Sequence, residues 1–316
     1  MNHYQNEEDR KYERIKNNSG KLQIGPQLYE NVKIDNLRVM FDLGSGAFGK
    51  VTQRVLNNRI LAVKEMQKTD NEEENKRIYM DLQVITCNDC SFIVKSYGYI
   101  ITFDHVYICM EKMEMCLEKL NKKYIKPQEM NIPECILGKI TVPVVTALKY
   151  LNDEHEIMHR DIKPSNILID LNGNIKLCDF GIAGKIIDSD ESIGCRAYLS
   201  PERMKRSKYD IRADIWSLGI TLIELATSKF PYPFESYFEL FYAVTEMSAP
   251  KLPKNFSHDF HEFLDKCLEK DVEKRANYNE LESMKWYQIQ NALKCDVEKW
   301  LANVCDALIE DGDSEN

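Results

Sequence analysis

The sequence predicts an α+β protein in which a small β-rich half precedes a larger helical half. Between about residues 38 and 110, short runs of β-type residues are separated by turn-forming residues, which is typical of strands. Beyond residue 130, apolar residues recur at the spacing of one helix face. With 316 residues, 43% of them hydrophobic, the chain is long enough for two domains or for one domain of two lobes.

The β-rich half is expected to form a sheet with a glycine-rich turn, a tight hairpin and one helix. Asn57-Asn58 suits the hairpin turn, because asparagine tolerates positive φ. The spacing of Ile78, Leu82 and Ile85 predicts that the helix buries one face. The expected elements are strands over 39–43, 50–56, 59–66, 92–103 and 106–110 and a helix over 72–86, and the two halves are expected to join at 111–114.

One hairpin is expected inside the helical half, between strands over 166–170 and 174–178. The residues that connect them include Asn172-Gly173, and Asn-Gly is the strongest short-range hairpin signal. Motifs with chemical potential lie on both sides of this hairpin.

Composition and charge argue against several classes of function. A net charge of −9, from 42 basic and 51 acidic residues, disfavours a broad nucleic-acid surface. No apolar run approaches the roughly 18 residues that a membrane span needs. Ten cysteines without a secretory signal indicate reduced thiols rather than a disulfide framework. We therefore expect a cytoplasmic protein, with the nucleus as an alternative, and no nucleic-acid or membrane partner.

Both ends of the chain are polar. Residues 1–20 are crowded with asparagine and charge, which predicts a mobile N-terminal tail, and residues 307–316 predict an acidic tail. A helical extension over 291–306 is expected to precede the acidic tail.

A glycine-rich stretch follows the first strand of the main domain. Backbone N–H groups in such a stretch can approach phosphate oxygens closely. A lone GxGxxG pattern is a weak signal that dinucleotide-binding folds share. Here a second strand follows in place of a helix, and no acidic residue lies in the ribose-binding position, so the dinucleotide alternative is disfavoured. The stretch reads Gly44-Ser45-Gly46-Ala47-Phe48-Gly49.

A lysine follows on the third strand, in Ala62-Val63-Lys64. Lys64 could reach the phosphates of a nucleotide held by the glycine-rich stretch, and the alternative is an ordinary solvated strand lysine. A catalytic lysine needs an acidic partner, and Asp81 on the following helix is the candidate.

Three further motifs predict the transfer of a phosphoryl group to a hydroxyl. Asp161 would accept the hydroxyl proton and Lys163 would steady the transferred group. Asn166 and Asp179 offer the oxygen ligands that Mg²⁺ prefers. The motifs are, in order, His159-Arg160-Asp161-Ile162-Lys163-Pro164-Ser165-Asn166, Asp179-Phe180-Gly181 and Ser200-Pro201-Glu202.

Together these motifs form the protein-kinase signature, and the chain resembles MAP kinase kinases. The resemblance covers about residues 38–290 and implies a bilobed protein-kinase fold, with an N-lobe over 38–112 and a C-lobe over 113–290. It implies Mg-ATP as the cofactor, and Thr and Tyr of a MAP kinase activation loop as the substrate. The segments that carry it beyond the signature are 75–82, 175–182, 200–203 and 209–219. Segments 22–25 and 296–300 are similar to the branch that activates Jun-N-terminal kinases.

The resemblance also implies roles for residues outside the motifs. Met110 would be the gatekeeper residue, residues 111–113 the hinge, and Cys116 a thiol at the hinge edge. The implied nucleotide-binding set is Leu43, Gly44, Ser45, Gly46, Ala47, Phe48, Gly49, Val51, Ala62, Lys64, Met110, Glu111, Met113 and Cys116. Asp81 would pair with Lys64 in place of the usual glutamate, Asp214 would brace the catalytic loop, and Glu202 would pair with Arg275.

The segment between Asp179 and Glu202 departs from the family pattern. Ser189 and Ser192 are three positions apart instead of four, and the family's threonine is missing. We expect both serines to be regulatory phosphorylation sites that an upstream kinase modifies, with Arg160 as the partner of the added phosphate.

Docking and function each leave alternatives open. Basic residues over 10–16 with Leu22 and Ile24 fit a substrate-docking motif only loosely, so a charged tail or a separate scaffold protein is the alternative. Residues 286–304 could receive the upstream kinase or pack on the core. The alternatives for function are a kinase for another stress-activated MAP kinase class, or a weakly active interaction protein with a kinase fold.

Overall fold

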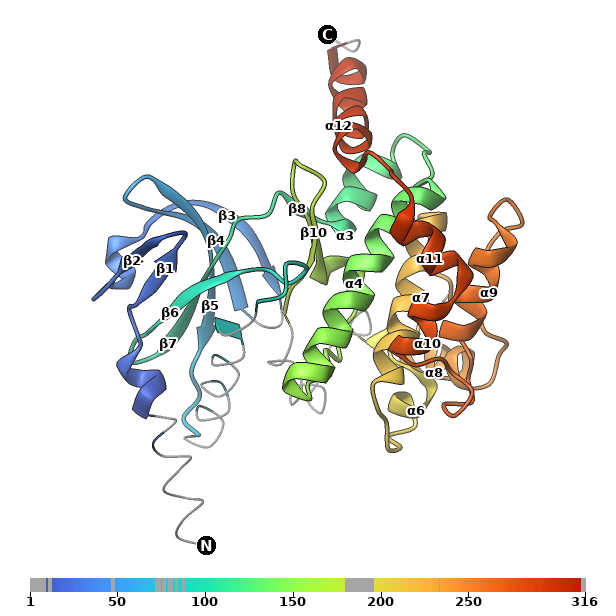
Figure 1. The fold of residues 1–316 in the computed structure, drawn as a ribbon, viewed down its shortest axis with the longest axis horizontal. Coiled ribbons are helices and arrows are strands. Elements are labelled where there is room, and N and C mark those ends of the chain that lie inside the picture. The colour runs from blue at the N-terminus through green and yellow to red at the C-terminus, as the bar shows by residue number, and fades with distance from the viewer. Residues whose placement is uncertain are drawn as a thin grey trace, which may run out of the picture. The chain divides into compact units, whose positions relative to one another are not determined.

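The computed structural model describes residues 10, 13–46, 49–71, 75, 78, 82, 85–86, 89–179, 196–232 and 234–313. The chain divides into two compact units, Met1–Met113 and Glu114–Asn316 (Figure 1). The first is rich in strands and the second in helices, which confirms the predicted α+β order. None of the helices in the described ranges combines the length and apolar character that crossing a bilayer requires.

A seven-stranded antiparallel sheet forms most of the first unit. The strand order is β2-β1-β6-β7-β5-β4-β3. The strands are β1 (Leu22–Ile24), β2 (Gln27–Tyr29), β3 (Arg38–Gly46), β4 (Gly49–Leu56), β5 (Arg59–Gln67), β6 (Ser96–Ile101) and β7 (His105–Met110), and a short 3₁₀ helix, η1 (Ile34–Asn36), lies between β2 and β3. The predicted turn between β4 and β5 is confirmed, because Asn57 and Asn58 have φ of 46° and 65°.

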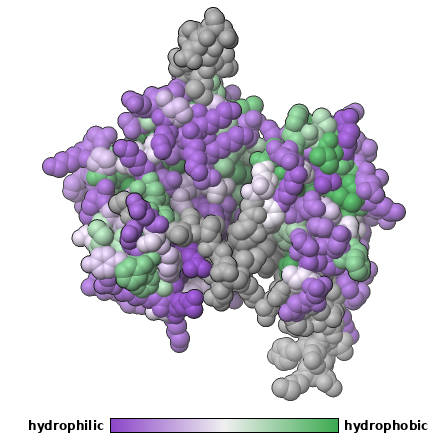
Figure 2. Space-filling model, turned by 180° about the vertical axis from the view of Figure 1, so that it is seen from behind, coloured by the Kyte–Doolittle hydropathy of each residue, from purple (hydrophilic) through white to green (hydrophobic). Residues whose placement is uncertain are grey.

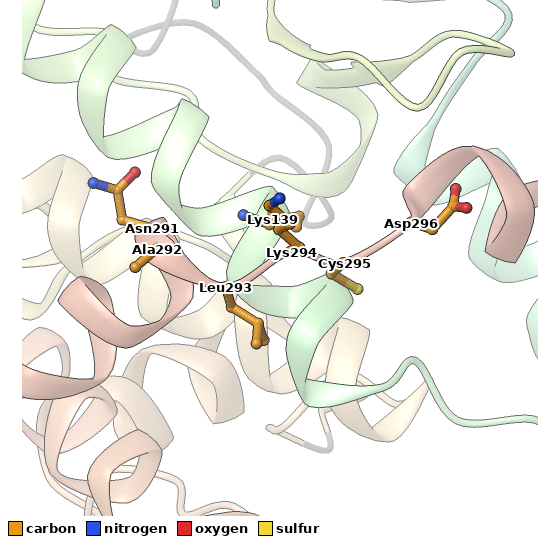
Figure 3. Close-up of a pocket in the computed structure, with 7 residues that line it drawn as sticks. All are labelled: Lys139, Asn291, Ala292, Leu293, Lys294, Cys295 and Asp296. Atoms are coloured by element: carbon orange, nitrogen blue, oxygen red, sulfur yellow. The ribbon is translucent and has the colours of Figure 1, made fainter.

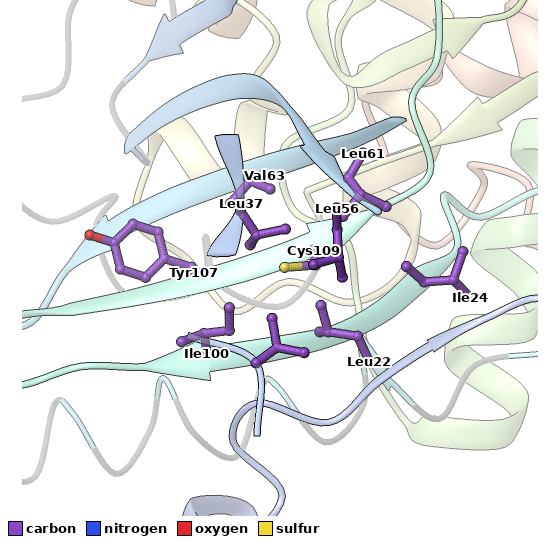
Figure 4. Close-up of a cluster of buried hydrophobic side chains, with 10 residues drawn as sticks. Leu22, Ile24, Leu37, Leu56, Leu61, Val63, Ile100, Tyr107 and Cys109 are labelled. Atoms are coloured by element: carbon purple, nitrogen blue, oxygen red, sulfur yellow. The ribbon is translucent and has the colours of Figure 1, made fainter. Parts of the chain in front are cut away.

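The sheet has two chemically different faces. Leu61 and Val63 on β5 point into an apolar cluster that the β1–β2 hairpin helps to cover (Figure 4). The cluster consists of Leu22, Ile24, Val32, Leu37, Leu56, Leu61, Val63, Ile100, Tyr107 and Cys109. Because side chains alternate along a strand, Ala62 and Lys64 lie on the opposite face. The pleat therefore separates the fold's core from the predicted nucleotide-binding residues.

Part of the expected N-terminal tail is ordered on the sheet. Residues 13–17 are helical, and the Ile15 side chain is buried. The Tyr99 hydroxyl donates to the Ile15 carbonyl at 2.9 Å, and the Gly20 N–H donates to the Tyr99 carbonyl at 2.9 Å. Although the segment is polar overall, the buried Ile15 side chain and these two hydrogen bonds attach residues 13–20 to the first unit.

Of the predicted helix over 72–86, the structure describes residues 75, 78, 82, 85 and 86, and all are helical. Leu82 and Ile85 are buried, as their spacing predicts.

The second unit is built around one long helix, α4 (Glu134–His155), which continues through Pro143. Helices α7 (Arg212–Thr227) and α11 (Lys285–Ala292) pack against α4 (Figure 1). In the core beside them, the Trp286 and Phe260 rings stack with centroids 4.2 Å apart. The other helices are α3 (Leu117–Leu120), the π-helical turn η2 (Asn121–Ile125), η3 (Pro164–Asn166), α6 (Pro201–Met204), α7 (Arg212–Thr227), α8 (Tyr237–Thr245), α9 (His258–Cys267), α10 (Tyr278–Ser283), α11 (Lys285–Ala292) and α12 (Val297–Asp313).

A small antiparallel sheet in this unit carries the predicted hairpin. Its order is β10-β9-β8, with β8 (Met115–Cys116), β9 (Ile167–Ile169) and β10 (Ile175–Leu177). Gly173 in the β9–β10 turn has φ of 76°, and a Cβ there would lie 2.8 Å from the backbone nitrogen of Glu298. The turn therefore lies directly against the first turn of α12.

The C-terminal boundaries differ from the prediction. The expected extension over 291–306 is two elements, because α11 ends at Ala292 and residues 293–296 form a linker before α12. Helix α12 continues to Asp313, so most of the predicted acidic tail is helical backbone.

The surface in Figure 2 is mainly hydrophilic, with apolar areas confined to small separate patches.

Candidate active site

The glycine-rich stretch forms the closed end of the β3–β4 hairpin. Gly44 pairs with Val51, Ser45 with Lys50, and Gly46 with Gly49. Of the predicted nucleotide-binding residues, Ala47 and Phe48 lie outside the described part of the chain. Leu43 is partly exposed on β3 and Val51 is half-buried on β4.

Gly49 and Gly44 are glycines for different reasons. Gly49 has φ of 117°, and a Cβ there would lie 2.0 Å from the Glu65 carbonyl oxygen, so the fold itself requires glycine. Gly44 has no positive φ and no atom within 4 Å of an added Cβ. Among the eight glycines whose surroundings are described, Gly44 is the one that the fold does not explain. Open space above a bare backbone fits a phosphate group that approaches the N–H groups.

Lys64 lies on β5 between two neighbouring strands. Its backbone pairs with Val51 on β4 and Ile108 on β7, and its residue is only 3% exposed. Ala62, two positions earlier on the same face, pairs with Met110 and is also buried. The structure thus brings together Ala62, Lys64, Val51 and Met110 as the resemblance implies. The predicted partner of Lys64, Asp81, lies outside the described residues.

The segment after β7 is fixed by a two-way contact. The Glu111 N–H donates to the Lys95 carbonyl at 3.0 Å, and the Glu111 carboxylate accepts from the Lys95 N–H at 2.6 Å. Met113, at the end of the first unit, is buried. The predicted hinge, 111–113, therefore has defined backbone hydrogen bonding at its start.

Cys116, at the end of β8 in the second unit, is a half-buried thiol. Its Sγ accepts from the Lys119 N–H at 3.4 Å and caps α3. Burial raises its pKa, and the backbone hydrogen bonds oppose this shift only in part. A thiol in this state is a weak nucleophile at neutral pH.

The catalytic loop places two donors on one carboxylate. The Asp161 Oδ2 atom lies 2.8 Å from the Lys163 ammonium and accepts from the Asn166 amide nitrogen at 2.8 Å. The same Asn166 nitrogen donates to the Asp161 carbonyl at 2.7 Å. The structure therefore brings these three predicted residues together, with the carboxylate held in one orientation.

The two predicted metal ligands flank the β9–β10 hairpin, with Asn166 directly before β9 and Asp179 shortly after β10, so both lie at its open end. Both N–H groups of the Asn166 amide point to Asp161, so the amide oxygen is the atom left for a cation. The Cys178 N–H donates to the Asn166 carbonyl at 3.0 Å, which holds Asp179 close to Asn166 in the fold. Asp179 has φ of 63°, a conformation that turns the chain sharply after β10. An amide oxygen and a carboxylate suit Mg²⁺.

Asp214 braces the catalytic loop, as implied. It is 1% exposed, and its carboxylate accepts from the His159 and Arg160 N–H groups, each at 2.7 Å. Burial raises the pKa of Asp214, while His159, Arg203 and the two N–H groups act in the opposite direction. The loop backbone is thus fixed by a carboxylate from α7, more than 50 positions away.

Glu202 and Arg275 form the predicted ion pair. The guanidinium donates to both carboxylate oxygens, at 2.7 and 3.0 Å, and the Arg275 side chain is fully buried. Burial alone would raise the pKa of Glu202, but the Arg275 hydrogen bonds and charge outweigh it and the pKa is lowered. The pair anchors α6 to the residues before α10.

Two braces of the catalytic loop had no local signal in the sequence. Arg203 donates to the Arg160 carbonyl at 2.5 Å, and the His159 Nε2 atom lies 2.8 Å from the Cys178 carbonyl. Arg203 is 43 positions from its acceptor, so no periodicity or spacing could reveal the contact. His159 belongs to a predicted motif, but its link to the strand before Asp179 required the structure.

The predicted phosphorylation sites, Ser189 and Ser192, lie outside the described residues, as do Phe180 and Gly181. Their predicted partner, Arg160, has φ of 71° and a buried Nε atom that has no hydrogen-bond partner among the residues that the structure describes.

Comparisons with known proteins agree with this geometry. The protein kinase domain family model matches residues 37–287. The Drosophila melanogaster protein "Dual specificity mitogen-activated protein kinase kinase hemipterous" is 47% identical over 313 residues, which cover 95% of this chain and 26% of that protein. The human "Dual specificity mitogen-activated protein kinase kinase 7" is 45% identical over 310 residues, 94% of this chain and 73% of that protein.

A nematode relative extends the same pattern. The Caenorhabditis elegans "Dual specificity mitogen-activated protein kinase kinase mek-1" is 43% identical over 279 residues, 86% of this chain and 79% of that protein. The chain therefore spans about a quarter of the fly relative and about three quarters of the human and nematode relatives. From its kinase-domain match, its assembled catalytic loop and these relatives, the chain belongs to the dual-specificity mitogen-activated protein kinase kinases, a family of protein kinases with a β-rich N-lobe and a helical C-lobe.

Proposed function

We propose that this chain transfers the γ-phosphoryl group of Mg-ATP to Thr and Tyr in the activation loop of a Jun-N-terminal-type MAP kinase. We base the chemistry on one observation, the Asp161 carboxylate held by both Lys163 and Asn166. A carboxylate fixed in this way can accept the proton of a substrate hydroxyl. The Jun-N-terminal branch rests on the resemblance of residues 22–25 and 296–300 to that branch.

The residues present fit Mg-ATP. When bound, Mg-ATP would supply the transferable phosphoryl group and the cation that neutralises its charge. Asn166 and Asp179 would hold the metal through oxygen atoms, and Lys64 would bind the phosphates. Asp161 would orient the substrate hydroxyl and take its proton, while Lys163 would balance the charge that develops beside it. Positioning of this kind supports turnover on the order of 1–100 s⁻¹ in protein kinases.

Regulation would act on the catalytic loop through Arg160. Within the described part of the chain its buried Nε atom has no acceptor, so it is a donor that a phosphate on Ser189 or Ser192 would satisfy. Arg203 lies next to Arg160, and the two positive charges disfavour each other. A phosphate with a charge of about −1.5 to −2 would relieve this repulsion. An upstream kinase would therefore switch the enzyme on.

Substrate and upstream kinase would be the main partners, with a scaffold protein as a third, in the cytoplasm and also in the nucleus. Leu22 and Ile24 are buried in β1, so the docking motif that they loosely resemble is not available for a partner. A scaffold or a surface elsewhere on the chain would then bring the MAP kinase to the enzyme.

The decisive experiment measures phosphate transfer to catalytically inactive MAP kinases of each class, with the modified residues mapped by mass spectrometry. The Asp179→Ala variant serves as the blank, and the double variant Ser189→Asp/Ser192→Asp as the switched-on form. We expect transfer to both Thr and Tyr of the Jun-N-terminal class, increased in the double variant.

Each other outcome has a defined meaning. Transfer to a different stress-activated class would reassign the branch but keep the enzyme. ATP binding without transfer in both the wild type and the double variant would contradict the proposal and favour an interaction protein. Full activation by an upstream kinase after alanine replacement of both serines would remove them as regulatory sites.

A further inference from the structure

Two cysteines that are 160 positions apart in the sequence meet in the second unit. The Cys135 and Cys295 sulfur atoms lie 2.8 Å apart, and both residues are half-buried. A disulfide bond is about 2.05 Å long, so closing this gap needs only a small side-chain movement. No such contact joins any two of the other cysteines in the described ranges.

The two sulfurs belong to segments of very different restraint. Cys135 lies in the first turn of α4, next to Glu134, whose carboxylate accepts from the Trp286 Nε1 atom at 2.8 Å and from Ser257 at 2.5 Å. Cys295 lies in the linker over 293–296, which has no regular secondary structure. Cys135 thus lies at a helix start that side-chain hydrogen bonds hold, whereas Cys295 lies in irregular backbone.

A pocket beside Cys295 gives solvent access to the linker. Its volume is about 520 Å³, and Figure 3 shows the linker passing across α4 beside Lys139, one of the lining residues. Lys139 donates to the Gln290 carbonyl at 3.0 Å, so one cation already ties α11 to α4 at this point. The linker residue Lys294 is exposed in the same pocket. A small oxidant can thus reach the Cys295 thiol.

The linker sets the position of α12. The first turn of α12 abuts Gly173 in the β9–β10 turn, and the Val304 carbonyl accepts from Gln128 at 3.2 Å. The hairpin that ends at this turn carries Asn166 and Asp179 at its other end. Restraining the linker would therefore restrain a helix that touches the catalytic hairpin.

We propose that Cys135 and Cys295 are a redox modification site, which closes to a reversible disulfide on exposure to hydrogen peroxide and fastens the α11–α12 linker to α4. The inference does not depend on the identity of the kinase substrate. Intracellular disulfides of this kind are typically transient and redox-sensing.

The reaction balances as a two-electron oxidation. One thiolate attacks the O–O bond of hydrogen peroxide, which gives a sulfenic acid and releases hydroxide. The second thiolate then attacks the sulfenic sulfur, which forms the S–S bond and expels hydroxide. The thiol protons combine with these hydroxides, so two thiols and one peroxide give one disulfide and two waters. A thiol reductant reverses the bond by exchange.

The environment of Cys295 indicates that oxidation is slow. Burial and the neighbouring Cys135 sulfur raise the pKa of Cys295 to about 12, with Lys139 acting in the opposite direction and Asp296 reinforcing the shift. Little thiolate is then present at neutral pH, so a time course over hours at excess peroxide is needed.

The test oxidises the purified full chain with hydrogen peroxide, blocks the remaining thiols, and maps disulfide-linked peptides under non-reducing conditions. The variants are Cys135→Ser and Cys295→Ser, with Cys305→Ser on α12 as the matched control. Melting temperatures of all variants under reducing conditions establish that they fold. Trypsin cleavage after Lys294 reports on the linker directly.

We expect a Cys135–Cys295 peptide in the wild type and in Cys305→Ser. Oxidation should raise their melting temperature on the order of 5–10 °C and slow cleavage at Lys294, with both effects reversed by dithiothreitol. The Cys135→Ser and Cys295→Ser variants should show neither effect. Recovery of both cysteines as free thiols or as separate sulfinic acids, or a wild-type melting temperature unchanged by oxidation, would overturn the proposal.

Discussion

The two halves of the predicted site are positioned by different means. In the first unit, Lys64 occupies a regular strand position, and its place follows from the ladder and the pleat. In the second unit, Asp161 sits in irregular backbone that buried polar groups hold from outside, chiefly Asp214 and Arg203. A ladder spreads its restraint over many hydrogen bonds, whereas an irregular loop depends on a few buried contacts.

This difference indicates where substitutions should destabilise each unit most. Removing one buried partner leaves the other unpaired, which destabilises by more than the interaction itself contributes. In a ladder, the vulnerable positions are instead those where backbone conformation or close approach excludes a side chain. The following predictions test that contrast.

The largest expected effect comes from the catalytic loop. Asp161→Asn keeps the shape of the side chain but removes the carboxylate that would accept the substrate proton. We expect kcat to fall about 10²- to 10⁴-fold, with ATP affinity close to that of the wild type. Steady-state kinetics and calorimetric nucleotide binding measure the two quantities. Retention of more than a tenth of the wild-type kcat would contradict the role of Asp161.

Breaking the buried ion pair should have the next largest effect, and it should act on the stability of the protein. Glu202→Gln leaves the fully buried Arg275 guanidinium without its counter-charge, and we expect the free energy of unfolding to fall by about 3–5 kcal/mol. Urea unfolding measures the loss. The double variant Glu202→Leu/Arg275→Met should be less destabilised than Glu202→Gln alone, and an equal or greater loss in the double variant would show that the unpaired charge is not the cause.

The glycine-rich hairpin should respond at one glycine and not at the other. In Gly49→Ala the added Cβ would clash with the Glu65 carbonyl oxygen, and the residue would keep a positive φ. We therefore expect the free energy of unfolding to fall by about 2 kcal/mol or more. Gly44→Ala should change the stability by less than about 1 kcal/mol and weaken ATP binding. Thermal unfolding and nucleotide titration of both variants check this. Equal destabilisation by the two would contradict the distinction drawn between them.

The smallest effect is a difference in acid response between two buried carboxyls. The pKa of Glu202 is lowered, so its stabilising contribution is present above its ordinary pKa and is lost as the pH falls through the lowered value. The pKa of Asp214 is raised, so its contribution decreases as the pH rises from its ordinary value through the raised one. The stability gap between wild type and Glu202→Gln should therefore narrow below about pH 4.5.

Asp214→Asn provides the matched measurement. Relative to wild type, this variant should lose less stability as the pH rises above about 4, which is the opposite trend. Urea unfolding at a series of pH values compares both variants with the wild type. Parallel pH dependence in the two variants would contradict the assigned directions.

Local pattern was enough to predict the regular parts of the molecule. Asn57-Asn58 and Asn172-Gly173 formed the turns that their conformational preferences predict, and Leu82 lies on the expected buried face. The motif residues Asp161, Lys163 and Asn166 come together because they lie within one short loop. Contacts between residues that are close in the sequence can be predicted from the sequence.

Contacts between distant segments could be predicted only from the family resemblance, or could not be predicted from the sequence. The Glu202–Arg275 pair came from the family pattern, since 73 positions separate the two residues. Ordering of Ile15 on the sheet, the Arg203 brace and the extension of α12 to Asp313 had no local signal. The Ile15 and Arg203 contacts depend on partner segments that come together only after folding.

The pleat of β5 has a consequence for how this sequence can change over evolutionary time. Val63 faces the apolar cluster and Lys64 faces away from it, and both neighbouring strands fix that alternation. Deleting a single residue between Arg59 and Lys64 would shift the register of the strand by one position. The Lys64 ammonium group would then face the apolar cluster, and Val63 would face away from it. This stretch can therefore accept many substitutions of similar character, but it should be closed to insertions and deletions of odd length.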